Sequence, residues 1–139
     1  MKEAAVRELR NLIAVSPSFD MCDSDFYLSC GTAGCIGGHA ALLWEEVRFR
    51  NTFDEHELGR KLGINQEEAH ELCFVSKYRK ENEHKWPIKG TRLWYDIHRE
   101  QALAVLDELA DTGLVNWAKV MDPMLEEKYG NAIQEAGVS

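Results

Sequence analysis

The sequence lacks any long hydrophobic run. Its longest uninterrupted apolar stretch covers only residues 40–44 of 139, whereas a membrane-spanning helix needs about 20 residues. The first residues include the acidic Glu3 and no apolar signal core, so we expect no export signal. We therefore expect a cytoplasmic protein that has no membrane partner.

Positive charge is also scarce. The chain has 16 Lys and Arg against 24 Asp and Glu, a formal net charge of −8. Proteins that bind nucleic acid in general neutralise phosphates with clustered Lys and Arg. This composition makes DNA binding unlikely as the general role of the chain. An acidic surface suits solubility or a basic protein partner.

Patterns typical of β-strands and repeats are missing as well. No alternation of apolar and polar residues extends beyond four positions, and no segment recurs at a fixed period. Apolar residues instead recur at helical spacing. We predict an all-α protein, a compact bundle of five or six helices in a single domain over residues 1–130, with a flexible C-terminal tail at 131–139.

Capping residues mark the predicted helices. Thr52 with Glu55 and Asn65 with Glu68 have the spacing of capping boxes, and glycines follow two of the helices. Asp122-Pro123 is typical of a helix start. The predicted helices cover residues 2–15, 32 to about 48 or 50, 52–63, 65–76, 96–112 and 122 to about 130, and residues 77–92 are predicted to form a long loop.

The chemistry is concentrated in a cysteine segment that begins at Cys30. If Thr32 caps the next helix, Cys35 lies in its first turn, where unpaired backbone N–H groups favour a thiolate. His39 is four residues further on and faces the same side. In a reducing compartment such thiols are free, bind a metal or take part in redox chemistry.

Four interpretations of this segment are open. Cys22, Cys30, Cys35 and His39 could form a zinc site, because these are zinc-binding residue types, although their spacing matches no common zinc module. Cys35 could be a catalytic nucleophile with His39 as its base. Cys30 and Cys35 could form a redox pair. The favoured interpretation is that both cysteines are buried small hydrophobes beside glycines that allow helices to cross closely.

A basic and aromatic stretch is the better candidate for a ligand contact. Residues 77–92 hold six cations against two glutamates, and aromatic residues alternate with the cations as a nucleotide or RNA contact would require. The alternative is a solvated loop whose tryptophans enter the core. The candidate ligand-binding residues are Lys77, Arg79, Lys80, Trp86, Arg92 and Trp94.

Two other features have plain structural explanations. Residues 58–72 have the spacing of two helices and a turn that is typical of a helix-turn-helix. However, Glu67, Glu68 and Glu71 would face DNA phosphates, so a helical hairpin is favoured. The remaining histidines lie on polar faces of predicted helices or in the basic loop and form no close pair with another ligand, so we expect surface positions for His56, His70, His84 and His98.

The segment Cys30-Gly31-Thr32-x-x-Cys35-Ile36-x-Gly38-His39-Ala40 resembles the Cys-Gly-Thr-x-x-Cys-Ile-Ala-Gly-Trp/His-Ala signature of an uncharacterised family of small bacterial and phage proteins. The likeness extends over roughly residues 5–113. The chain departs from the signature at Gly37, where alanine is usual, and Cys22 has no counterpart. The family has no assigned activity, so the resemblance implies no mechanism.

These features rank two kinds of function. We expect a small, soluble, non-enzymatic binding or regulatory protein, for example one that is encoded by a phage and acts on a host component. Its partner would be a protein or a small anionic ligand. The alternative is a zinc-binding or thiol-dependent protein centred on Cys30, Cys35 and His39.

Overall fold

A computed structural model describes residues 1–17, 19, 35–49, 52–82, 84–86 and 96–135. Within these residues the fold class is all-α, as predicted, with seven α-helices and one two-stranded hairpin. The elements in chain order are α1 (Glu3–Val15), α2 (Ile36–Leu43), the 3-10 helix η2 (Glu45–Val47), β1 (Arg48–Phe49), β2 (Thr52–Phe53), α3 (Glu55–Leu62), α4 (Gln66–Phe74), α5 (Ser76–Asn82), α7 (Arg99–Thr112) and α8 (Trp117–Glu135). None of the described helices is long and apolar enough to cross a membrane.

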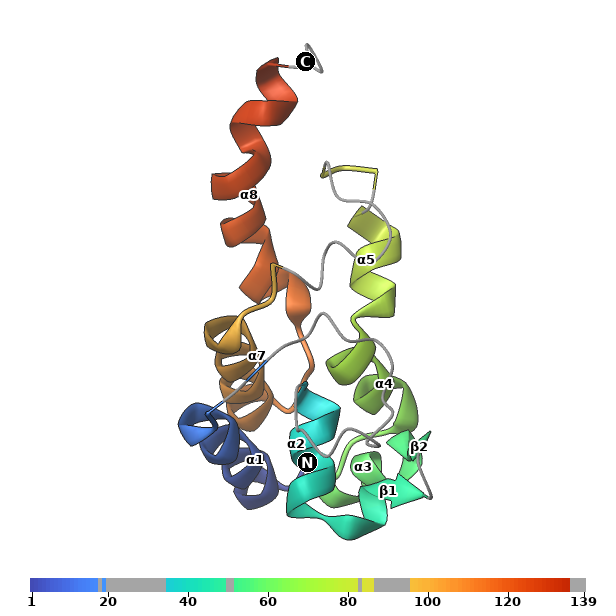
Figure 1. Cartoon of the computed structure of the whole chain (residues 1–139). Helices are drawn as coiled ribbons and strands as arrows, with labels where there is room; N and C mark the ends of the chain where they lie inside the picture. The colour runs from blue at the N-terminus through green and yellow to red at the C-terminus, as the bar shows by residue number, and fades with distance from the viewer. Residues whose placement is uncertain (18, 20–34, 50–51, 83, 87–95, 136–139) are drawn as a thin grey trace.

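Helix α2 occupies the centre of the molecule. Residues 36–40 are all buried, and the helix contacts α1 on one side and α4 on another. A helix whose first five residues are all buried begins inside the bundle, whereas Leu42 near its end is 66% exposed. Figure 1 shows α1, α7 and α8 on one side of α2 and α3, α4 and α5 on the other.

Local sequence signals predicted several helix ends correctly. Gly63 and Gly113 end α3 and α7 with φ of 70° and 78°, a left-handed conformation that glycine adopts without strain. The side chain of Asn65 accepts a hydrogen bond from the Glu68 backbone N–H at 2.7 Å and begins α4.

Two predicted boundaries near the hairpin are wrong. Helix α2 ends at Leu43, because Trp44 is extended and the following turn directs Val47 into the core. Helix α3 is capped by Asp54, whose carboxylate accepts from the Glu57 backbone N–H at 3.1 Å. Thr52, the predicted cap, lies in β2, which pairs antiparallel with β1.

Burial also overrides the predictions for α5 and α8. Residues 77–82 were expected in a loop, but Tyr78 is buried and they form most of α5. Helix α8 starts at Trp117, before the predicted Asp122-Pro123 start, because Trp117, Met121 and Leu125 form a buried stripe at helical spacing. Pro123 lies inside this helix, which continues to Glu135, past Gly130.

Candidate functional site

Cys35 begins α2 but offers little reactive surface. Cys35 is the N-cap residue, and its Sγ accepts a hydrogen bond from the Gly38 backbone N–H at 3.3 Å. Cys35 is only 7% exposed, so solvent reaches its sulfur poorly. Thr32, the predicted cap, lies outside the described residues.

His39 is held as a structural residue. Its Nδ1 lies 2.8 Å from the Cys35 carbonyl oxygen and its Nε2 lies 2.7 Å from Ser16 Oγ. A carbonyl only accepts, so Nδ1 carries the proton and Nε2 accepts from the serine hydroxyl. Both ring nitrogens are therefore engaged, and neither is left to bind zinc or to take a proton from the Cys35 thiol.

The structure describes only two of the four residues of the predicted zinc site, Cys35 and His39. Cys22 and Cys30 lie outside the described residues. Among the residues that the structure describes, no group of three or more His, Cys, Asp or Glu could hold a metal ion. Cys35 and Cys73 are both buried as thiols. Burial, with smaller contributions from Cys35 and Glu55, raises the pKa of the Cys73 thiol well above its ordinary value, which makes it a poor nucleophile.

The burial of His39 has a consequence for stability. Desolvation, opposed by the hydrogen bond to the Cys35 carbonyl and aided by the charge of Arg99, lowers the pKa of His39 below its ordinary value of 6.5. Between these two pKa values the unfolded chain takes up a proton that the native state does not. Stability is then fully present above the unfolded value and is lost as the pH falls.

We expect the free energy of unfolding to decrease between about pH 7.5 and pH 5, and to decrease less in His39→Gln. Urea unfolding at a series of pH values measures this difference in slope. His56→Gln, which changes an exposed histidine of α3, should keep the wild-type slope. Equal slopes for wild type and His39→Gln would contradict the prediction.

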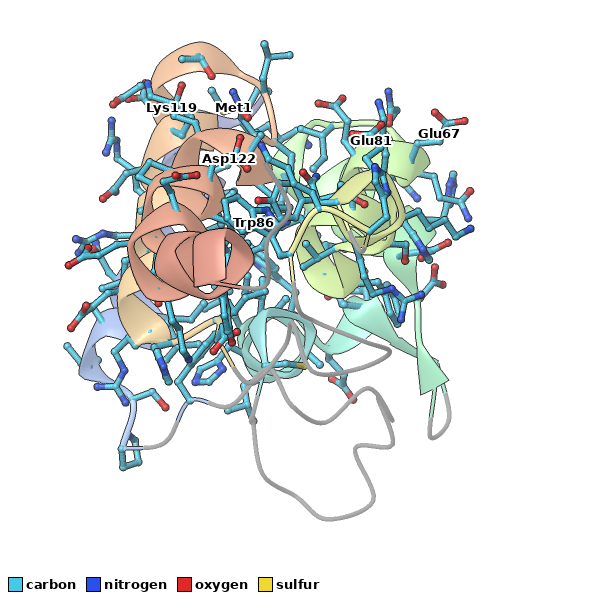
Figure 2. All side chains as sticks on the ribbon, turned by 90° about the horizontal axis from the view of Figure 1, so that it is seen from above. Met1, Glu67, Glu81, Trp86, Lys119 and Asp122 are labelled. Carbon is cyan, nitrogen blue, oxygen red and sulfur yellow. The ribbon has the colours of Figure 1, made fainter. Side chains whose placement is uncertain are left out.

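The structure separates the predicted ligand-binding residues. Lys77 and Lys80 line a pocket. Arg79 is half-buried and already engaged by the protein. Trp86 is 3% exposed and lies between the two sides of the bundle (Figure 2), so its ring packs in the core and is closed to ligands from solvent. Arg92 and Trp94 lie outside the described residues.

The pocket that Lys77 and Lys80 line is formed by α3, α4 and α5. Its volume is about 650 Å³, within the range of about 300–1,000 Å³ that is usual for small-molecule sites. Its lining is polar in residue type and comprises Glu55, Gln66, Glu67, His70, Glu71, Ser76, Lys77, Lys80 and Glu81.

A continuous hydrogen-bonded chain crosses this pocket. Ser76 Oγ lies 3.2 Å from His70 Nε2, and His70 Nδ1 lies 2.7 Å from Glu55 Oε2. Gln66 Nε2 donates to the other carboxylate oxygen of Glu55 at 3.0 Å. The ring of Phe74 stacks on the His70 ring with their centroids 4.6 Å apart. The imidazole is therefore fixed by contacts on both nitrogens and on one face.

The link between α4 and α5 sets the position of Ser76. Val75 has φ of 54°, a left-handed conformation that costs a β-branched residue about 1–2 kcal/mol. The Glu71 carboxylate accepts from the backbone N–H groups of Lys77 at 2.8 Å and Tyr78 at 3.0 Å. Burial of Val75 and this carboxylate cap hold the turn against its strain.

Sequence reasoning missed the most organised part of this pocket. His70 was predicted to be an ordinary surface histidine, but the structure pairs it with Glu55 and Ser76. One signal was available, because Gln66 and His70 are four residues apart on one helix and share a face. The partners Glu55 and Ser76 lie on two other helices, and no spacing rule joins them.

Comparison of the chain with protein-family models, curated proteins and solved structures gives no match. The geometry of this pocket is therefore the basis for a proposed function.

Proposed function

We propose that this is a small-molecule binding protein of the cytoplasm, whose site is the pocket between α3, α4 and α5. The ligand carries groups of both charges, as an amino acid or a short peptide does. The main support for this proposal is the set of charged side chains that line the pocket. Cys35 and Cys73 are thiols, which suits a reducing compartment.

Half of the carboxylates in the pocket are satisfied by the protein itself. Glu55 accepts hydrogen bonds from Gln66 and His70. Glu71 accepts from the backbone of α5. Both are held in place by these contacts, and their lone pairs are partly used. They shape the pocket more than they attract a ligand.

The charges that remain balance one another. Glu67 and Glu81 are exposed, as are Lys77 and Lys80. Within the described residues none of these four forms an ion pair. Figure 2 shows Glu67 and Glu81 on the α4–α5 side of the molecule. A ligand with an ammonium and a carboxylate can satisfy both signs, whereas a purely anionic ligand would meet two unpaired glutamates.

We expect thermal unfolding in the presence of a dipeptide to reveal this site. A ligand at tenfold its Kd stabilises the native state by about 1.4 kcal/mol, which raises the Tm by about 4 °C for a domain of this size. The probes are alanylalanine, its N-acetyl derivative and its C-terminal amide. The zwitterion should raise the Tm, and each derivative that lacks one charge should raise it less.

Variants locate the effect in the pocket. The double substitution Lys77→Gln/Lys80→Gln should remove the rise in Tm. Lys119→Gln is the matched control, because Lys119 is exposed on α8 on the opposite side of the molecule (Figure 2) and should leave the rise unchanged. If no amino acid or dipeptide raises the Tm at about 20 mM, the proposed function is wrong.

A further inference from the structure

We infer that Ser76 is a nucleophile and that the pocket transfers the acyl group of a small carboxylic ester to its hydroxyl. His70 acts as the general base and Glu55 orients it. The inference rests on the proposed function in one respect, since it places the substrate in the same pocket. It adds a reaction to what would otherwise be a binding site.

The polarity of the hydrogen bonds is correct for this role. An ionised carboxylate only accepts, so the contact of 2.7 Å between Glu55 Oε2 and His70 Nδ1 places the imidazole proton on Nδ1. The lone pair of Nε2 then faces Ser76 Oγ at 3.2 Å. A nucleophile, a base and a group that orients the base thus follow one another in the order that nucleophilic catalysis requires.

Access favours this chain of groups over a second Ser–His pair in the molecule. Ser16 Oγ lies closer to His39 Nε2, at 2.7 Å. However, His39 is completely buried and its Nδ1 faces a backbone carbonyl, which carries no full charge to stabilise an imidazolium. The side chain of His70 is 42% exposed and that of Glu55 is 28% exposed, and both line the pocket. The Ser16–His39 pair is therefore an internal control.

The backbone before Ser76 supports the same conclusion. A non-glycine residue with positive φ is uncommon, and strained residues of this kind cluster at functional sites. Val75 holds φ of 54° directly before Ser76. In α/β-hydrolases the nucleophilic serine lies on a strained turn between a strand and a helix; here the strained residue directly precedes the serine, between two helices. The strain here places the serine hydroxyl at the pocket wall instead of continuing α4.

Charge developing on the substrate needs a cation from the side chains. The backbone N–H groups of Lys77 and Tyr78, which follow Ser76, already donate to Glu71. They cannot also serve as donors for an oxyanion. Lys77 and Lys80 line the same pocket, and their flexible side chains can bring an ammonium group to the carbonyl oxygen of a bound ester. This arrangement favours activated esters and a modest rate.

The reaction balances without a cofactor. Ser76 Oγ attacks the carbonyl carbon of the ester, and its proton passes to His70 Nε2. The tetrahedral intermediate collapses and expels the alcohol, which takes the proton from His70. A water molecule then gives a proton to His70 and attacks the acyl carbon. The acid leaves, and the serine recovers its proton from the imidazole.

The experiment treats the full chain with a biotinylated alkyl fluorophosphonate and maps the adduct by mass spectrometry. Serine displaces fluoride only if its hydroxyl is activated. We expect the adduct on Ser76 in the wild type and in Ser16→Ala, and none in Ser76→Ala. With p-nitrophenyl acetate, His70→Gln should lower the rate of acylation of Ser76 by about 10²- to 10⁴-fold. Glu55→Gln should lower the same rate by at least about tenfold, because the carboxylate no longer fixes the tautomer of His70.

The dipeptide experiment separates this inference from the proposed function, because Ser76→Ala leaves all charged groups of the pocket in place. A dipeptide-induced rise in Tm without an adduct on Ser76 overturns the inference and leaves the binding function standing. An adduct on Ser76 without a rise in Tm supports the nucleophile and overturns the dipeptide ligand. Labelling that persists in Ser76→Ala, or that is lost equally in Ser16→Ala, overturns the inference.

Discussion

Leu106→Ala should lower the free energy of unfolding by about 3 kcal/mol. Leu106 is fully buried on α7, and α7 forms the most extensive helix contact of the bundle, with α1. Truncation removes the transfer free energy of the lost methyl groups and leaves a cavity that a packed core closes only in part. Thermal unfolding should show a fall in Tm of about 10 °C.

Two control variants show whether packing dominates this interface. Arg10 on α1 forms an ion pair with Asp107 on α7 at 3.1 Å, but both side chains are at least one-third exposed. Arg10→Ala should therefore cost less than about 1 kcal/mol. Leu114 is 61% exposed, and Leu114→Ala should change stability by less than about 0.5 kcal/mol. A loss in Arg10→Ala as large as that in Leu106→Ala would contradict the packing argument.

The parts of the fold that could be predicted from sequence are those set by local physics. Gly63, Asn65 and Gly113 act within one turn of their own helices, and such signals can be recognised in the sequence. The spacing of the apolar residues and the composition of the chain indicated the all-α class for a similar reason, because helical spacing repeats along each element.

The wrong boundaries share a different cause. Trp117 begins α8 because its ring is buried and its Nε1 donates to the Glu71 carbonyl oxygen at 2.8 Å, 46 residues away in sequence. The Asp122-Pro123 signal is valid locally, but the buried stripe of α8 outweighs it. Contacts between distant residues decide such cases, and a single sequence does not display them.

The candidate site likewise has one part that the sequence predicted and another part that it did not. The lysines of the pocket were predicted from a visible cluster of cations at residues 77–92. The chain formed by Glu55, His70 and Ser76 was not, because it requires three helices to meet. It also requires Val75 to adopt a left-handed conformation that its side chain disfavours.

Glu71→Ala should lower the free energy of unfolding by about 2 kcal/mol and remove binding at the pocket. The Glu71 carboxylate accepts two backbone hydrogen bonds from the first turn of α5. Loss of a helix cap costs about 0.5–2 kcal/mol, and hydrogen bonds to a charged group contribute about 1.5–3 kcal/mol. Ser76, Lys77 and Lys80 all belong to α5, so a loosened helix displaces them together.

The competing explanation is that Tyr78 alone anchors α5. Tyr78 is 4% exposed, and burial, together with its hydrogen bond to Asp122, raises the pKa of its phenol, so the hydroxyl stays protonated and donates. Comparison of Glu71→Ala and Tyr78→Phe with the control Glu67→Ala by urea unfolding decides between the two, and dipeptide binding is compared between Glu71→Ala and Tyr78→Phe alone. Glu67 is exposed on the same helix, and its loss should cost less than about 0.5 kcal/mol. If Glu71→Ala is as stable as Glu67→Ala while Tyr78→Phe is not, the buried tyrosine and not the carboxylate cap holds the pocket together.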